Sequence, residues 1–172
     1  MTRRAQLFWV LVGLTVIVYG ALGYTSGIVL RQMSGGLLSF DFRSAGYSYA
    51  EAQAFLSSLT PAGTEYYLNT VLRIDAVFPA LLTMVLAIII LHLTQVSEPL
   101  LRAFVAVPPF AYAGFDYWEN ALVRQMLQFP GDQLPETLVS LASGATMSKF
   151  VALVVSAVIV FGLLVLRRRK LA

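Results

Sequence analysis

The chain has 172 residues, of which 58% are hydrophobic and 12% are charged, whereas a typical soluble domain carries about 25% charged residues. Four of the twelve Lys and Arg residues form one run directly after an apolar segment, so the net charge of +3 does not indicate a nucleic-acid partner. The absence of cysteine excludes disulfide frameworks, thiolate metal sites and cysteine nucleophiles.

The first apolar run covers residues 7–30 and follows Arg3 and Arg4. A charged start before an apolar stretch is also typical of a cleaved signal peptide. The run is longer than the apolar core of such a peptide, so we interpret it as a retained membrane span.

Glycines recur along this first run. Gly13, Gly20 and Gly27 are spaced by seven residues, and Gly23 forms a G-x-x-x-G motif with Gly27. Glycine-rich faces let another helix approach closely. The spacing predicts a helix-packing face. We favour its use within the bundle, and the alternative is a contact with another chain.

Residues 31–75 form the longest polar stretch and are predicted to make a small helical cap outside the membrane. Ser48 and Glu51 have the three-residue spacing of a capping box, which predicts a short helix directly after Ser48. Thr60 and Pro61 predict the start of a second helix, with the threonine as N-cap and the proline at the first helical position.

Three further apolar runs are predicted to cross the membrane, at residues 76–93, 100–117 and 150–166. Pro108 and Pro109 interrupt the middle one of these runs, where they are expected to kink the helix and free backbone carbonyls. The pattern predicts an all-α fold. The predicted fold is a four-transmembrane-helix bundle with a small helical cap between the first two helices, and residues 1–172 are predicted to form one domain.

Lysine and arginine positions predict the orientation in the membrane. With four spans, both termini and the short turn at residues 94–99 share one side, and short basic flanks gather there. Cytoplasmic flanks are enriched in basic residues, so we expect cytoplasmic termini and a bacterial inner membrane. The basic residues on the opposite side are Arg31, Arg43, Arg73, Arg124 and Lys149.

Polar residues gather where the second span begins and the third span ends. The candidate ligand-binding residues are Asp75, Asp116, Glu119, Asn120, Arg43 and Arg73. Up-and-down topology brings the two helix ends to one level. Spacings of three and four residues place the three polar residues of the third span on one helical face. The stretch around Arg43 is expected to fold down onto this cluster.

Ionisable groups in a membrane protein are costly and tend to be paired or functional. The structural interpretation, which we favour, is a set of ion pairs. Asp75 would pair with Arg43 or Arg73, and Glu119 with Arg124. The functional interpretation is a site at the outer leaflet that binds a cation, a lipid headgroup or a sugar phosphate, or that performs acid–base chemistry. We predict no metal site and no cofactor.

The single histidine, His92, lies near the end of the second span. It could act as a proton relay or as an axial ligand of a pigment magnesium, and we favour a histidine at the membrane interface. The sequence lacks P-loop, dinucleotide-binding, metalloprotease and nucleophile-elbow motifs.

Two motifs carry a resemblance. A D-x-x-F-P motif begins at Asp75 and a D-x-x-E-N motif begins at Asp116, with Gly-Tyr-Ser at residues 46–48 upstream. This pattern resembles one in uncharacterised bacterial multi-pass membrane proteins with four helices, and it covers residues 40–124. The resemblance implies no activity, ligand or partner.

Two classes of function remain. We favour a non-catalytic accessory, assembly or scaffold component of a membrane complex, because the chain is small, lacks catalytic motifs and carries close-packing glycines. The alternative is a membrane protein or enzyme that handles a lipid or small ligand at an acidic site in the outer leaflet. The expected partners are membrane lipids and other membrane protein subunits.

Overall fold

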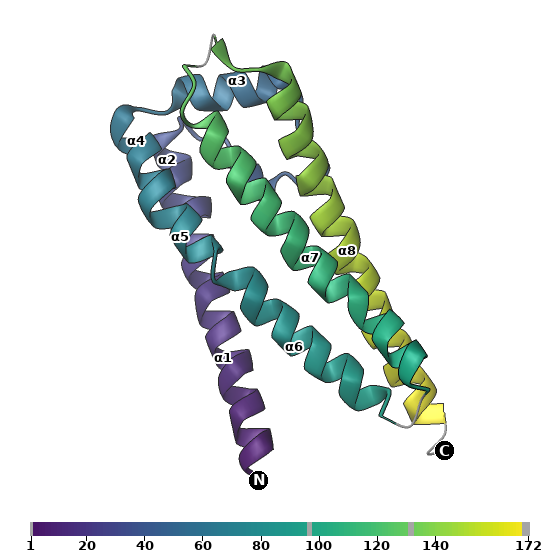
Figure 1. The fold of residues 1–172 in the computed structure, drawn as a ribbon. Coiled ribbons are helices and arrows are strands. Elements are labelled where there is room, and N and C mark those ends of the chain that lie inside the picture. The colour runs from purple at the N-terminus through teal and green to yellow at the C-terminus, as the bar shows by residue number, and fades with distance from the viewer. Residues whose placement is uncertain (1, 96–97, 131–132, 170–172) are drawn as a thin grey trace.

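The computed structural model describes residues 2–95, 98–130 and 133–169. The elements in chain order are α1 (Arg3–Tyr24), η1 (Thr25–Leu30), α2 (Arg31–Met33), η2 (Phe40–Phe42), α3 (Tyr49–Ser58), α4 (Pro61–Tyr66), η3 (Tyr67–Val71), α5 (Leu72–Asp75), α6 (Phe78–Leu93), α7 (Pro99–Met126) and α8 (Glu136–Arg169). None of the described residues is in a strand, which confirms the all-α prediction. Figure 1 shows the long helices side by side, with both chain ends at one end and α3 across the other.

Within the described residues, three continuous helical rods are long and apolar enough to cross a membrane: Arg3–Met33, Pro61–Leu93 and Glu136–Arg169. These rods are consistent with an integral membrane protein. The predicted third span lies inside α7, which is not one of the three, because its prolines and charged residues lower its mean hydropathy. Length and composition thus support three of the four predicted spans.

The second rod begins earlier than predicted. Thr60 caps α4 as expected, with its Oγ1 accepting a hydrogen bond from Gly63 N at 3.1 Å. The helix then continues through η3 and α5 and, after a turn, into α6. Residues 61–75 therefore extend the apolar helix and are not a separate part of the cap. Asp75 lies at the turn between the two halves of this rod.

The last rod also begins earlier than predicted. The fourth predicted span, residues 150–166, is the distal part of α8, which starts at Glu136. Much of the chain between the third and fourth predicted spans is therefore helical. This places Lys149 inside a long helix, whereas the predicted orientation counted it with the outer flanks.

The capping box before α3 is present as predicted. Ser48 Oγ accepts from Glu51 N at 3.3 Å, and Glu51 Oε2 accepts from Ser48 N at 2.8 Å. Ser48 N and Ser48 Oγ both donate to the Glu51 carboxylate, which stabilises its ionised form and lowers the pKa of Glu51. The box fixes where α3 begins and how the preceding loop enters it.

An aromatic core joins this loop to the helices. Phe40 is fully buried, and its ring lies 4.6 Å from Tyr47, 4.9 Å from Phe55 and 6.5 Å from Tyr67, measured between ring centroids. Such ring pairs add packing energy beyond the area they bury. The aromatic core therefore holds residues 40–47 firmly against α3 and η3.

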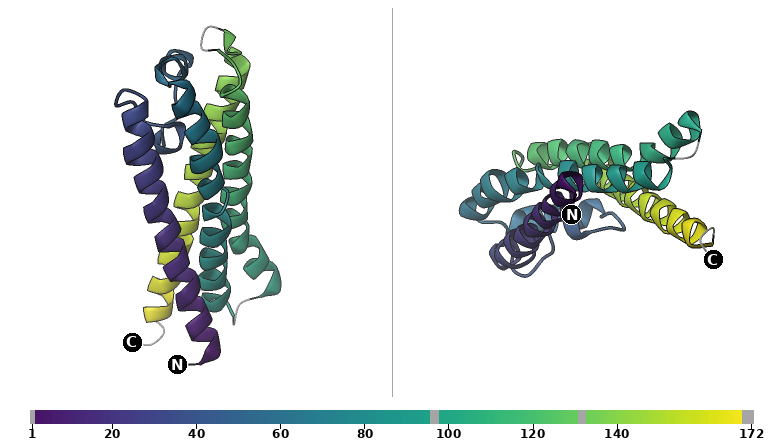
Figure 2. Two further views of the ribbon diagram at one scale, coloured as in Figure 1. Left: turned by 90° about the vertical axis from the view of Figure 1, so that its left-hand side faces the viewer. Right: turned by 90° about the horizontal axis from the view of Figure 1, so that it is seen from below.

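The helix α7 is bent and contains two prolines. Figure 2 shows the first part of α7 leaning away from the line of the remainder. Pro108 and Pro109 lie inside the helix, where a proline cannot donate the usual backbone hydrogen bond. Thr83 Oγ1 donates to the Pro109 carbonyl at 2.8 Å and ties α6 to α7 at this level.

The glycines of α1 and η1 do not form a packing face within the described chain. A Cβ atom placed on Gly13, Gly20 or Gly23 would have no neighbouring heavy atom within 4 Å, and one on Gly27 would meet only Phe42 at 3.6 Å. The favoured prediction of close packing inside the bundle is therefore wrong. Although α1 packs against α6, no heavy atom of the described chain approaches the Cβ positions of Gly13, Gly20 and Gly23, and Gly27 lies in η1 beside Phe42.

Candidate functional site

Four of the predicted site residues converge in the interior. Asp75 comes from the end of α5, and Asp116, Glu119 and Asn120 come from one face of α7. Their exposed fractions are 4%, 1%, 0% and 9%. Helical spacing explains why the α7 residues share a face, and the packing of the second rod on α7 brings the Asp75 carboxylate to them.

A buried lysine completes the cluster. Lys149 Nζ, from α8, forms an ion pair with Asp116 Oδ1 at 2.9 Å and a second ion pair with Glu119 Oε2. All three side chains are almost fully buried. An ion pair of this kind needs further hydrogen bonds to offset the cost of removing its charges from water.

Those further hydrogen bonds are present. Thr146 Oγ1 donates to Glu119 Oε1 at 2.5 Å, and Asn120 Nδ2 donates to Asp116 Oδ2 at 3.4 Å. Thr146 lies three residues before Lys149, so α8 presents the hydroxyl and the ammonium on one face. Asp116 is thus held from α7 and α8, and Glu119 is held from α8.

The arginines expected in the cluster lie elsewhere. Arg43 donates to the Leu38 carbonyl from Nε at 3.1 Å and from Nη2 at 2.8 Å. Arg73 is exposed and donates to Asn69 Oδ1 at 3.3 Å.

The exposed Arg124 makes no ion pair with Glu119 in the described part of the chain. The predicted arginine pairings are therefore wrong. The predicted set of site residues omitted Lys149, although the repeat of Ser143, Thr146 and Lys149 along one face of an apolar helix was a usable signal.

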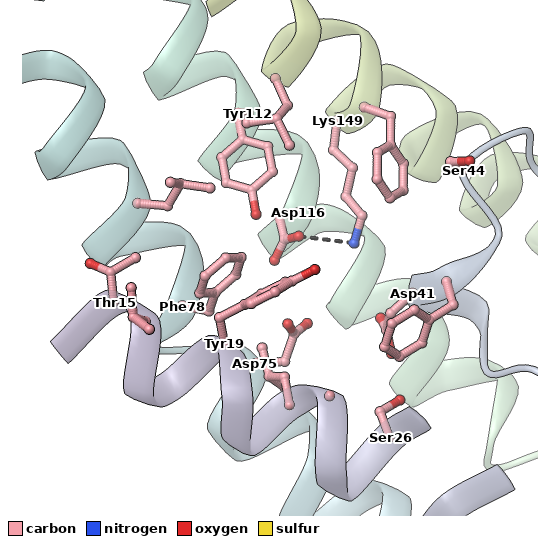
Figure 3. A pocket seen from close by; sticks show the side chains of 17 residues that line it. Thr15, Tyr19, Ser26, Asp41, Ser44, Asp75, Phe78, Tyr112, Asp116 and Lys149 are labelled. Atoms are coloured by element: carbon pink, nitrogen blue, oxygen red, sulfur yellow. Dashed lines mark hydrogen bonds and ion pairs between the residues drawn. The ribbon is translucent and has the colours of Figure 1, made fainter. Parts of the chain in front are cut away.

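A cavity of about 620 Å³ opens beside the cluster. Figure 3 shows Asp75, Asp116 and Lys149 facing the same space, with the Tyr19 and Phe78 rings beside them. The remaining walls are largely apolar and come from α1, η1, α6, α7, α8 and the loop before α3. The lining residues include Thr15, Val16, Leu22, Gly23, Ser26, Asp41, Phe42, Ser44, Leu82, Tyr112, Phe150 and Leu153.

Two carboxylates at this cavity lack a cationic partner among the described residues. Asp75 Oδ2 is buried and has no hydrogen-bond partner there. Asp41 Oδ2 accepts from Tyr67 Oη at 3.2 Å, while its Oδ1 is buried without a partner. Since Lys149 already pairs with Asp116 and Glu119, the cavity wall holds more acidic than basic side chains.

The loop that carries Asp41 is fixed to α8 by a close approach. Gly46 has a φ of +81°, and a Cβ there would lie 2.7 Å from Ser143 Oγ and 3.1 Å from the Met147 side chain. Beside it, Tyr47 N donates to Ser143 Oγ at 2.8 Å. Glycine is required here both for its backbone conformation and for the contact.

A left-handed backbone conformation costs an alanine about 1–2 kcal/mol. Replacing Gly46 with alanine is expected to lower the free energy of unfolding by more than this amount. The added methyl group would also push the loop off Ser143. Gly35→Ala is the matched control, because Gly35 has a φ of +64° and its added methyl group would meet no heavy atom within 4 Å. Thermal unfolding of both variants checks this, and equal losses would contradict it.

His92 takes no part in this site. It is exposed near the C-terminal end of α6 and does not line the cavity.

No family model, curated protein or solved structure matches the chain. The cavity and its buried charges therefore carry the functional argument.

Proposed function

We propose that this chain is an integral membrane protein that binds an amphipathic ligand in the cavity between α1, α6, α7 and α8. The observation that carries the proposal is a mostly apolar cavity of about 620 Å³ with buried carboxylates at one place in its wall. Ligand sites commonly measure about 300–1,000 Å³ and combine apolar walls with a few polar groups. The apolar walls suit a hydrocarbon part, and the carboxylates suit a polar head.

Four membrane spans are part of this proposal, with α7 as the fourth. At about 1.5 Å per residue, its 28 residues reach about 42 Å, which exceeds a hydrocarbon core of about 30 Å. Its acidic residues Asp116 and Glu119 face the protein interior, so they do not meet lipid. Its exposed apolar side chains, which lipid would cover, include Leu100, Leu101, Phe104, Val107 and Phe110.

The proposed orientation places both termini in the cytoplasm of a bacterium, with the protein in the inner membrane. Figure 1 shows both ends of the described chain at one end of the molecule, as four crossings require. Arg3 and Arg4 begin α1 there, and Arg167–Arg169 end α8 there. Basic flanks of this kind favour the cytoplasmic side.

An accessory or scaffold role in a membrane complex is the second candidate. It is supported by the face of α1 that carries Gly13 and Gly20, where an added methyl group would meet no atom of the described chain within 4 Å. A second membrane protein could approach closely there. This role and ligand binding are compatible, since the cavity and this face are separate features.

Filling the cavity tests the ligand-binding proposal. Leu153 lines the cavity, whereas its neighbour Val154 is 60% exposed on the outer face of the same helix. We expect Leu153→Trp to abolish co-purification of a bound amphiphile and Val154→Trp to retain it, because only the first indole occupies the cavity. Mass spectrometry of molecules extracted from the purified proteins measures this.

The wild type should carry a defined molecule enriched over the surrounding lipid. An extract identical to bulk membrane lipid in all three proteins would overturn the proposal. Native mass spectrometry of the same wild-type sample reports whether other polypeptides accompany the chain, which tests the accessory role.

A further inference from the structure

We propose that the polar head of the ligand is a primary amine in its ammonium form, received by Asp75 and Asp41. This inference rests on the proposed ligand-binding function and adds the chemical class of the ligand. It starts from two buried carboxylate oxygens that have neither a hydrogen-bond donor nor an ion pair among the described residues, Asp75 Oδ2 and Asp41 Oδ1.

The unpartnered oxygen of Asp75 is the stronger evidence for a hydrogen-bond donor on the ligand. Asp75 is 4% exposed, lines the cavity, and has an oxygen with no hydrogen-bond partner among the described residues. A buried carboxylate oxygen without a donor costs the protein free energy. A ligand that brings an N–H donor to this oxygen would recover that loss.

The charge of the ligand head follows from the other ionisable residues at the cavity. Lys149 is the only basic residue among those that line the cavity in the described chain, and both Asp116 and Glu119 already pair with it. A phosphate or carboxylate head would therefore meet the uncompensated charge of Asp41 and Asp75. An ammonium head compensates that charge, and a neutral head does not.

The aromatic rings at the cavity support a cation as well. Tyr19 and Phe78 form a ring pair with centroids 5.5 Å apart, and Figure 3 shows both rings next to Asp75 and Asp116. Aromatic faces attract ammonium groups. A quaternary ammonium would satisfy the charge and the rings but has no N–H for Asp75 Oδ2, so a primary amine fits better.

Photoreactive probes with one dodecyl chain and different heads test this inference. The full-length protein is placed in phosphatidylcholine nanodiscs and labelled with diazirine probes that end in a primary amine, a trimethylammonium, an alcohol or a carboxylate. Labelled residues are mapped by mass spectrometry, and affinity is measured by competition with the unlabelled compound. We expect the amine to label cavity residues most strongly.

Two variants sharpen the test. Asp75→Asn keeps the size of the side chain but removes its charge, and it is expected to weaken amine competition about 30-fold or more, because it removes one partner of a buried charge pair. Asp41→Asn should weaken it in the same direction. Glu65→Gln, which changes an exposed acid on α4, should leave it unchanged.

The outcomes separate this inference from the proposed function. If all four heads label the cavity equally, or if the carboxylate or trimethylammonium head is preferred, the amine inference is wrong while ligand binding stands. If no probe labels the cavity above the level of the lipid-facing surface, both are wrong. Unchanged amine competition in folded Asp75→Asn would also overturn the inference.

Discussion

Replacing Lys149 with methionine is expected to lower the free energy of unfolding by about 3–5 kcal/mol, the usual cost of removing one partner from a buried ion pair. Methionine fills a similar volume, so the loss would come from the charge. Asp116 and Glu119 would be left in the interior without their cation. Denaturation of the purified protein in mixed detergent micelles, followed by loss of helical signal, measures the change.

A neutralised cluster is the control for this prediction. The triple variant Lys149→Met, Asp116→Asn, Glu119→Gln should recover most of the lost stability, since it removes the stranded charges while retaining the side-chain volumes. Val151→Met, on the exposed side of α8, should have little effect. A single variant at Lys149 as stable as the wild type would show that the ion pairs contribute little.

Replacing Phe40 with alanine is expected to cost about 3–5 kcal/mol, because it empties a fully buried aromatic position. The ring contacts to Tyr47, Phe55 and Tyr67 would be lost together. The loop that carries Asp41 would then lose its main apolar anchor. Unfolding measurements give the stability change, and limited proteolysis reports the loosening of the loop.

Phe129 supplies the comparison for this second prediction. Its side chain is 39% exposed, so Phe129→Ala should cost far less. A protease pattern for Phe40→Ala that matches that of the wild type would mean that the loop is held without the aromatic core.

Local signals in the sequence were sufficient for several features. The capping box at Ser48 and Glu51 and the N-cap at Thr60 depend on residues three apart, so short-range hydrogen bonding decides them. The grouping of Asp116 with Glu119 and Asn120 follows from helical spacing alone. These interactions need no knowledge of which helices are neighbours.

Features that depend on neighbouring helices were not predicted, and the spacing of Ser143, Thr146 and Lys149 was the one signal that pointed to α8. Arg43, Arg73 and Lys149 were all available to pair with the acids, and composition does not rank them. The actual partner is decided by the packing of α7 on α8, which turns Lys149 inward, while Arg43 is taken up by the Leu38 carbonyl. The prediction for the glycines of α1 and η1 was wrong for the same reason. Their spacing shows that they share one side of the helix, but it does not show which helix packs there.

The two π-helical turns carry a consequence for register. η1 and η3 pack against each other, and η1 directly follows the part of α1 that brings Thr15 and Tyr19 to the cavity. A π-helical turn holds one more residue than an α-helical turn can. If the same residues formed regular α-helical turns instead, the preceding part of α1 would be rotated by about 100° relative to the chain that follows. The width of this one turn, more than the identity of any side chain, thus determines which face of α1 lines the cavity.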